Sequence, residues 1–399
     1  MKRKRQYKPL KFLKRKAISP FKWLRIFLKH RLGWLDRPKI ITYRSYGKGD
    51  KVEVWGGLVE DRGLAKPQGK ASIGANILAM FKRFTSDQLP GVKVQVSYNG
   101  IIQTIESDEY GLIRSQFNSN GNSFSQEDLW HPVRFALAEE VGDFRGTFSE
   151  KGEVLMLPHD ADFGVVSDVD DTILVSHATQ MVRKIQLMLL KNAHTRKPLP
   201  GAAAFYKALH EGKSGKKANP FFYVSSSEWN LYDLLDDFCH VNEFPKGVFL
   251  LKEFQSGLVN LIKAGGGNHD HKKDKITHLL DMYEDLPFIL IGDSGQRDAF
   301  IYLEIVKEFP GRIKTTYIRE VKHKKNTKKM QQLREEYKKH DVDFLVIEDT
   351  YQAALHALKT GYIHKSSLLP VLEATHGDKK APGEIRSILE EQGIVDHQD

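Results

Sequence analysis

Hydrophobic and polar positions follow three different patterns along the 399 residues of this chain. The first lies near the N-terminus, where an apolar residue recurs at every third or fourth position from Phe21 to Leu35. Lys22, Arg25, Lys29 and Arg31 mostly occupy other faces, and Pro20 and Gly33 lie close to the two ends of the segment. This spacing predicts an amphipathic helix with one apolar face and one cationic face.

From Lys39 to about Leu157, short stretches of alternating character separated by turn residues predict β-strands. The predicted strands are Lys51–Trp55, Val92–Tyr98, Ile101–Ser107, Leu112–Phe117, Val133–Leu137, Phe144–Phe148 and Glu153–Leu157. Asn99-Gly100 predicts a tight hairpin, and Glu150-Lys151-Gly152 is expected to join the last two strands. A helical segment near Gly74–Arg83 interrupts the series. Seven short strands with regular turns favour a small β-sandwich.

After Asp162, apolar runs alternate with helical stretches. The predicted strands are Phe163–Ser167, Pro220–Val224, Val248–Leu251, Phe288–Ile291 and Ile313–Ile318. The predicted helices are Ala202–His210, Glu228–Phe238, Lys273–Tyr283, Arg297–Glu308 and Met330–Lys339. This alternation predicts an α/β fold, a parallel sheet with helices on both faces and right-handed crossovers. The functional crevice of such a sheet lies at the carboxyl ends of its strands.

These changes of pattern divide the chain into four parts. We predict a basic amphipathic arm over residues 1–37, a sandwich-like β-rich domain over 38–158, the α/β domain over 159–370 and a C-terminal tail over 371–399.

Charge is distributed unevenly between these parts. Of the 61 Lys and Arg residues, 13 lie in residues 1–35, which contain no Asp or Glu; the remaining 48 face 51 acidic residues. The arm is therefore expected to contact an anionic membrane surface. Packing of the arm against the body, or a targeting or nucleic-acid tail, are the alternatives, and the mildly acidic body weakens the nucleic-acid interpretation.

Composition excludes several classes of protein. A hydrophobic content of 40% with 28% charged residues argues against wholesale disorder, and no apolar run is long enough to span a bilayer. Charged residues interrupt any secretory signal, and the single cysteine, Cys239, allows no intrachain disulfide. We expect a cytoplasmic protein, peripheral on the membrane if the arm binds there.

Polar residues follow several predicted strands directly. Asp168, Asp170 and Asp171 come after the first, where a hard cation such as Mg²⁺ would offset their mutual repulsion. An acidic turn or a helix N-cap is the alternative for this cluster. Ser225, Ser226 and Ser227 follow the second strand, where they can bind an anion or simply cap the next helix.

Lysine and acidic residues complete the set. Lys272 is placed to offset phosphate charge, although Lys252, Lys273 and Lys275 compete for this role and a solvated basic turn is the alternative. Gly292-Asp293 follows the fourth strand, where the glycine permits a tight turn. Asp298 can hold a metal-bound water or cap a helix.

In this order the residues resemble the four motifs of the haloacid dehalogenase superfamily of phosphotransferases. The matching positions are Asp168-Val169-Asp170-Asp171-Thr172, Ser225, Lys272, and Gly292-Asp293 with Asp298. Longer stretches resemble the actin-patch-protein phosphatidate phosphatase family, including its bacterial relatives, and a bacterial member is expected. These stretches are Asp168–Ile173, Phe221–Tyr232 and Leu286–Gly295. Glu228 departs from the small residue or proline that relatives often have at this position.

The resemblance implies a haloacid-dehalogenase-like, Rossmannoid catalytic domain and an aspartyl-phosphate mechanism. Asp168 would be the nucleophile and Asp170 the general acid and base, with Ser225 and Lys272 as further catalytic residues. Ser226 and Thr172 are expected at the substrate. Mg²⁺ would be held by Asp168, Asp170, Asp293 and Asp298. Because about 56 residues separate Asp168 from Ser225, only a small cap is expected, with one amphipathic helix near Gln180–Leu190.

The implied reaction is Mg²⁺-dependent hydrolysis of phosphatidate to diacylglycerol and phosphate. The main alternative is the same chemistry on a soluble phosphomonoester. A phospho-receiver module fits less well, because its phospho-acceptor lies on a later strand than its acidic pair. In a non-catalytic adaptor, the arm and the β-rich domain would be the functional parts. No nucleic-acid partner is expected.

Overall fold

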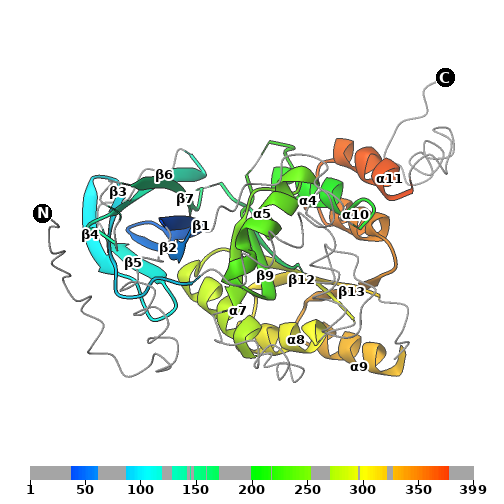
Figure 1. Ribbon diagram of the computed structural model, residues 1–399. Coiled ribbons are helices and arrows are strands. Elements are labelled where there is room, and N and C mark those ends of the chain that lie inside the picture. Colours follow the sequence, from blue (N-terminus) through cyan, green and yellow to red (C-terminus); the bar gives the residue numbers. More distant parts are fainter. Residues whose placement is uncertain are drawn as a thin grey trace, which may run out of the picture. The chain divides into compact units, whose positions relative to one another are not determined.

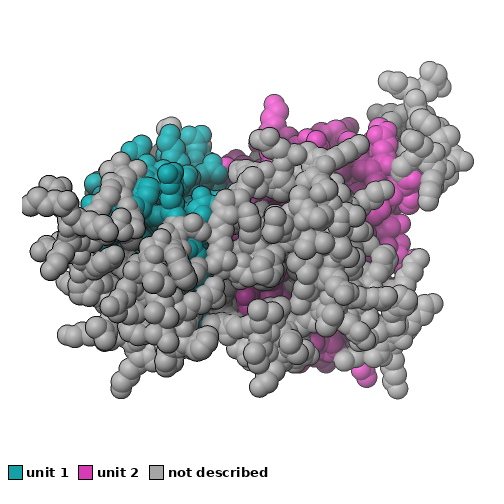
Figure 2. All heavy atoms as spheres, in the orientation of Figure 1, with its two compact units in different colours: residues 1–68, 78–156 teal, residues 69–77, 157–399 magenta. Residues whose placement is uncertain are grey.

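A computed structural model describes residues 37–61, 87–118, 128–141, 144, 148–158, 160–169, 199–216, 218–252, 270–294, 297–320 and 327–376. The chain divides into two compact units, residues 1–68 with 78–156 and residues 69–77 with 157–399 (Figure 2). The helices predicted in the arm, near residues 74–83 and in the cap near residues 180–190 lie outside the described residues.

The first unit is built on one seven-stranded sheet with the order β4-β3-β6-β7-β1-β2-β5. Its strands are β1 (Pro38–Lys48), β2 (Lys51–Glu60), β3 (Lys93–Tyr98), β4 (Ile101–Glu106), β5 (Leu112–Asn118), β6 (Trp130–Leu137) and β7 (Ser149–Met156). Alternate residues of these strands are buried in a shared core that includes Val54, Val96 and Phe135. The alternation arises because successive side chains of a strand point to opposite faces of the sheet.

The strands of the predicted sandwich-like domain form one connected sheet. β1 pairs with β2 antiparallel and with β7 parallel, and so links β4, β3, β6 and β7 to β2 and β5. The edge strands β4 and β5 also meet, because Ser115 donates to Gln103 Oε1 at 2.7 Å and Gln103 Nε2 donates to the Gln116 carbonyl at 2.9 Å. The core is therefore enclosed by one sheet folded on itself.

Two turn predictions in this unit had different outcomes. The Asn99-Gly100 hairpin is confirmed: both residues have positive φ, as a type I′ turn requires, and Tyr98 pairs with Ile101. The predicted turn at residues 150–152 is wrong, because β7 continues through it and pairs with β6. Gly152 is needed for space, since an added Cβ would lie 2.9 Å from Thr42 Cβ and 3.1 Å from Val133 Cγ1.

The second unit contains a six-stranded parallel sheet with the order β10-β9-β8-β11-β12-β13. Its strands are β8 (Gly164–Asp168), β9 (Phe221–Glu228), β10 (Val248–Lys252), β11 (Phe288–Asp293), β12 (Ile313–Arg319) and β13 (Asp343–Ile347). Numbered from β8, the spatial order is 3-2-1-4-5-6, the doubly wound arrangement of α/β proteins. The direction of winding reverses between β8 and β11, and ligands of such sheets bind at that point.

Helices cover both faces of this sheet (Figure 1). They are α4 (Ala202–Glu211), α5 (Tyr232–Val241), α7 (Asp270–Met282), α8 (Asp298–Glu308), α9 (Thr327–Lys338), α10 (Thr350–Lys359) and α11 (Leu368–His376). α4, α10 and α11 pack together on one face, and α7, α8 and α9 pack in sequence on the other. The parallel sheet with helices that the sequence predicts is therefore observed.

The C-terminal part of this unit extends further than expected. Neither β13 nor α10 was predicted, and residues from 371 onward were expected to form a tail. Val371 and Leu372 are instead buried in α11, which reaches His376. Among the helices of the described ranges, none has both the length and the apolar character that a membrane crossing requires.

Candidate active site

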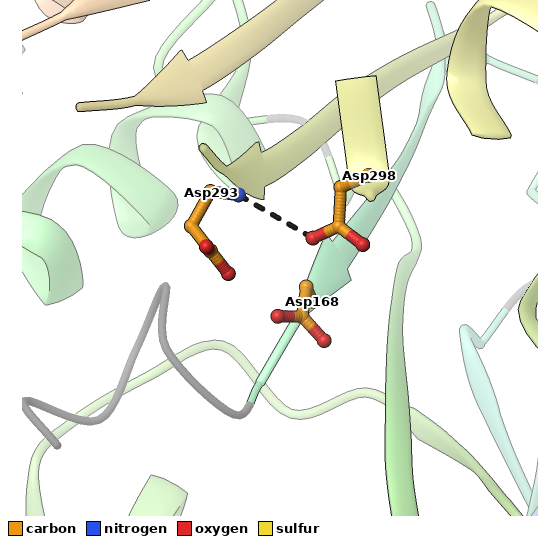
Figure 3. A group of neighbouring side chains, drawn as sticks. All are labelled: Asp168, Asp293 and Asp298. Atoms are coloured by element: carbon orange, nitrogen blue, oxygen red, sulfur yellow. Dashed lines mark hydrogen bonds between the residues drawn. The ribbon is translucent and has the colours of Figure 1, made fainter. Parts of the chain in front are cut away.

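Four charged side chains meet at the carboxyl ends of β8 and β11. Lys272 Nζ lies 2.9 Å from Asp168 Oδ1 and 2.9 Å from Asp298 Oδ1. The backbone N–H of Asp293 donates to Asp298 Oδ2 at 3.4 Å, and the three carboxylates converge (Figure 3). Asp168, Asp293, Asp298 and Lys272 are each at most 1% exposed. Asp168 and Asp293 lie at the carboxyl ends of β8 and β11, the two strands between which the direction of winding reverses. The sheet topology predicts a ligand at this point.

Each residue is positioned by the element that carries it. Asp168 ends the fully buried strand β8, and Asp293 ends the fully buried strand β11. Asp298 is the first residue of α8. Lys272 lies inside the first turn of α7, whereas the sequence analysis expected it before the helix.

Gly292 does not form the predicted tight turn. It lies within β11, where an added Cβ would come within 2.8 Å of Asp298 Cβ and Oδ2 and 3.0 Å of Tyr302 Cε2. The glycine therefore allows α8 to approach the strand closely enough to bring Asp298 beside Asp293.

Of the lysines considered for this role, Lys272 contacts two of the carboxylates. Lys273 instead pairs with Glu304 and Glu308, at 3.3 and 3.1 Å, with a side chain 33% exposed. Lys252 ends β10 in register with Glu228, and Lys275 lies one turn further along α7.

The serines lie on a strand and do not cap a helix. β9 continues to Glu228, and α5 begins at Tyr232 after a short 3-10 turn, Trp229–Leu231, so the predicted N-cap by Ser227 is wrong. Ser225 is buried and follows Val224, the register partner of Asp168. Its Oγ accepts a hydrogen bond from the Ser227 N–H at 2.9 Å, and Ser226 is exposed.

Two buried tyrosines surround the carboxylates. Burial, followed by the charges of Asp298, Asp168 and Asp293, raises the pKa of Tyr302 well above its usual value. Its hydroxyl therefore remains protonated and donates to the Ile291 carbonyl at 3.1 Å. Tyr206 of α4 shares a 2.8 Å hydrogen bond with Ser167, the residue before Asp168.

The donor set fits a small divalent cation. One carboxylate oxygen from each of Asp168, Asp293 and Asp298 lies within 4.8 Å of the others. These carboxylates are buried close together, and Mg²⁺ prefers carboxylate oxygens.

Three predicted site residues cannot be placed relative to this cluster. Asp170, Asp171 and Thr172 lie outside the described residues. Arg319, which was not among the predicted residues, ends β12 as the register partner of Asp293. It directly follows the strand predicted at Ile313–Ile318, so the strand-end criterion that selected Asp168 and Asp293 would have found it.

Comparison with known proteins relates the α/β unit to one family. Residues 163–320 match the family described as the catalytic domain of the phosphatidate phosphatase APP1. Phosphatidate phosphatase APP1 of Saccharomyces cerevisiae is 31% identical over 156 residues, which cover 39% of this chain and 25% of that protein. An uncharacterized protein of Schizosaccharomyces pombe is 27% identical over 206 residues, 51% of this chain and 31% of that protein. The chain thus spans about a quarter to a third of the length of these relatives.

The similarity to a solved structure is weak. A carbohydrate acetylesterase from Xanthomonas citri is 12% identical and covers 86% of this chain and 76% of its own. Its TM-score of 0.28 supports no inference about fold or activity.

Proposed function

Because residues 163–320 match the family described as the APP1 phosphatidate phosphatase catalytic domain, we propose that this chain is a Mg²⁺-dependent phosphatidate phosphatase of the haloacid dehalogenase type. The proposed reaction converts phosphatidate to diacylglycerol and inorganic phosphate. It is proposed to take place at a membrane surface.

One observation carries the proposal. Asp168 lies at the tip of the central strand of a doubly wound sheet, with Lys272, Asp293 and Asp298 beside it. A carboxylate in this place can reach a phosphate bound at the strand ends, and the neighbouring cation reduces the repulsion between them.

In the proposed mechanism Asp168 attacks phosphorus and the bond to the diacylglycerol oxygen breaks. Asp170 gives its proton to the leaving alkoxide, so that diacylglycerol departs and an aspartyl-phosphate remains. A water then attacks phosphorus while Asp170 accepts its proton. The acyl-phosphate P–O bond breaks, which releases phosphate and restores the Asp168 carboxylate.

Other residues of the site would prepare these steps. Lys272 holds Asp168 and Asp298 in place, and Ser225, on the adjacent strand end, would donate to a phosphate oxygen. Asp168, Asp293 and Asp298, with the backbone carbonyl of Asp170, would hold Mg²⁺, which when bound neutralises charge on the phosphate oxygens.

The lipid substrate is supported by the family and by the charge of the arm. A phosphatidate headgroup lies in an anionic bilayer surface, and the 13 basic residues of positions 1–35 would be attracted to it. Peripheral association with the membrane belongs to this proposal.

Phosphate release from phosphatidate vesicles tests the proposal. We expect turnover with Mg²⁺, none in EDTA, and recovery when Mg²⁺ is restored. D168N should fold but show no turnover, because an amide cannot act as the nucleophile. The matched control is D341N. Asp341 is exposed and has a positive φ that asparagine tolerates. It lies before the amino end of the edge strand β13, whereas the site lies at the carboxyl ends of the strands.

Two results would contradict the proposal. Turnover by D168N at the wild-type rate would remove Asp168 as the nucleophile. Equal rates on vesicle phosphatidate and on soluble sugar or short-chain phosphates would instead favour the soluble phosphomonoester as the substrate.

A further inference from the structure

Two hydroxyl side chains lie buried beside the proposed nucleophile. Ser167 immediately precedes Asp168 in the fully buried strand β8, and Tyr206 reaches it from α4. Both residues are buried, and their hydroxyl oxygens lie 2.8 Å apart. A buried hydroxyl is costly unless it is hydrogen-bonded, so the partners of these two groups show what the pair holds in place.

The protons of this pair can be assigned from its acceptors. Ser167 Oγ lies 2.9 Å from the carbonyl oxygen of Asp168, which can only accept. Serine has a single hydroxyl proton, and this proton therefore goes to the Asp168 carbonyl. Tyr206 must then be the donor in its bond with Ser167, and burial raises the pKa of Tyr206, so that its hydroxyl keeps the proton. Two hydrogen bonds thus run in a chain from α4 through Ser167 to the backbone of Asp168.

The tyrosine end of this chain is held by packing. The ring centroid of Tyr206 lies 5.6 Å from that of Phe221 on β9 and 5.5 Å from that of Phe244. A buried ring packed between other rings has little freedom to move. The Tyr206 hydroxyl is therefore a fixed point from which Ser167 is oriented.

The other end of the chain is the peptide group that joins Asp168 to Val169. Its carbonyl oxygen, which belongs to Asp168, accepts from Ser167. Its N–H, which belongs to Val169, donates to the Val224 carbonyl of β9 at 3.1 Å. Because a peptide group is planar, hydrogen bonds at both its oxygen and its N–H fix its orientation. This peptide group sets the direction in which the chain leaves β8 toward Asp170.

We propose that Tyr206 and Ser167 are positioning residues, which orient the peptide group after Asp168 and thereby the nucleophile and the chain that leads to Asp170. The restraint on the peptide group stands on the structure alone, and its use in catalysis rests on the proposed function. A displacement of about 1 Å near reacting groups can cost about 100-fold in rate. The two hydroxyls therefore contribute to turnover through the backbone of Asp168.

Hydrogen exchange of the full chain in EDTA tests the restraint. We expect S167A to speed exchange at the Val169 amide about 5-fold, as the loss of one hydrogen bond would, and Y206F to speed it at least about 2-fold. If S167A does not fold, Y206F decides the matter alone. An unchanged Val169 amide in either folded variant would overturn the inference.

The matched control is Y223F. Tyr223 is the register partner of Ser167 on β9, is equally buried, and donates through its hydroxyl to the Pro245 carbonyl at 2.7 Å. Y223F removes a comparable hydrogen bond and should leave exchange at Val169 unchanged. A rise in Y223F equal to that in Y206F would overturn the inference, because it would show a general loosening of the sheet.

Phosphate release from phosphatidate vesicles with Mg²⁺ tests the use of this restraint in catalysis. We expect kcat to fall about 10-fold in S167A and about 3- to 10-fold in Y206F, with KM changed less than about 2-fold, because both side chains act on the backbone of Asp168. The Y206F/S167A double variant should be no slower than S167A, since Tyr206 acts through Ser167. Y223F should keep the wild-type kcat.

The two measurements separate this inference from the proposed function. A wild-type chain that releases no phosphate from the vesicles with Mg²⁺ would contradict the proposed function, whereas exchange in EDTA would still decide whether Tyr206 and Ser167 hold the peptide group. In an active wild-type chain, an unchanged kcat in Y206F or additive losses in the double variant would overturn the positioning role and leave the proposed function standing.

Discussion

At the residue scale, Lys272 offsets the charge of two buried carboxylates. Its ammonium lies 2.9 Å from each of two buried carboxylates, on residues 104 and 26 positions away in the sequence. Removal of one partner from a buried charge group is costly because the others stay buried without compensation. The neighbouring lysine makes its ion pairs at the surface, where water screens them.

This difference predicts the effect of two adjacent substitutions. We expect K272M to lower the free energy of unfolding of the α/β unit by about 3–5 kcal/mol in EDTA. K273M, which removes ion pairs to Glu304 and Glu308, should cost at most about 1 kcal/mol. Urea unfolding of both variants measures the difference. Similar losses for the two would show that Lys272 does not stabilise the cluster.

Gly292 allows α8 to lie close to β11, because an added Cβ would come within 2.8 Å of Asp298. The Cβ of G292A would displace Asp298, and a displacement of about 1 Å near reacting groups can cost about 100-fold in rate. We expect phosphate release to fall by about 10- to 100-fold in folded G292A.

The control for this substitution is G100A in the β3–β4 hairpin. Gly100 has a φ of +80° and no heavy atom within 4 Å of an added Cβ. G100A should therefore cost stability through backbone strain while the rate per folded molecule stays unchanged. An unchanged rate in G292A would mean that Asp298 needs no such close approach.

At the element scale, a partly buried polar contact links α10 to the sheet. Tyr317 of β12 and His356 of α10 share a 2.9 Å hydrogen bond at Nδ1, and His356 Nε2 lies 3.3 Å from an Asp343 oxygen of β13. Burial lowers the pKa of His356 and outweighs the opposing effect of Asp343.

This contact predicts a pH dependence of stability. Because His356 takes up a proton less readily in the folded chain than in the unfolded chain, stability should fall as the pH falls below about 6.5 and level off below the lowered pKa. Urea unfolding between pH 7.5 and pH 5 measures the slope. H356Q lacks the titrating group and should show a shallower slope, and an identical slope in both proteins would contradict the assignment.

At the scale of the whole molecule, charge is separated along the chain. The arm holds 13 basic residues without an acid, and the rest carries 48 basic against 51 acidic residues. An acidic body gains little from an anionic surface, so attraction to a membrane would come from the arm. The family match covers residues 163–320 and leaves the arm and the β-rich unit outside it.

Deletion of residues 1–35 should therefore affect lipid and soluble substrates differently. We expect slower phosphate release from phosphatidate vesicles and an unchanged rate on p-nitrophenyl phosphate. Salt screens charges beyond roughly 10 Å at 0.1 M, so added NaCl should reduce the difference between the intact and shortened chains. Equal losses on both substrates would contradict a membrane role for the arm.

The strand-end residues of the candidate site could be predicted from the sequence because their signal is local. Asp168, Ser225 and Asp293 each follow or end an apolar run, and parallel strands bring such ends to one edge of a sheet. The Asn99-Gly100 hairpin was predictable for the same reason, since its two residues are suited to positive φ.

The tertiary structure decided the features that depend on distant partners. Gly152 and Gly292 both resembled turn residues, and only the side chains packed against them show that they provide space within strands. The curling of the first sheet follows from β1 pairing with β7, more than 100 residues further along the chain. The placement of Arg319 opposite Asp293 likewise depends on the register between β11 and β12. A sequence specifies conformation over neighbouring residues, whereas register and close approach are set by the packing of segments that meet only in the folded chain.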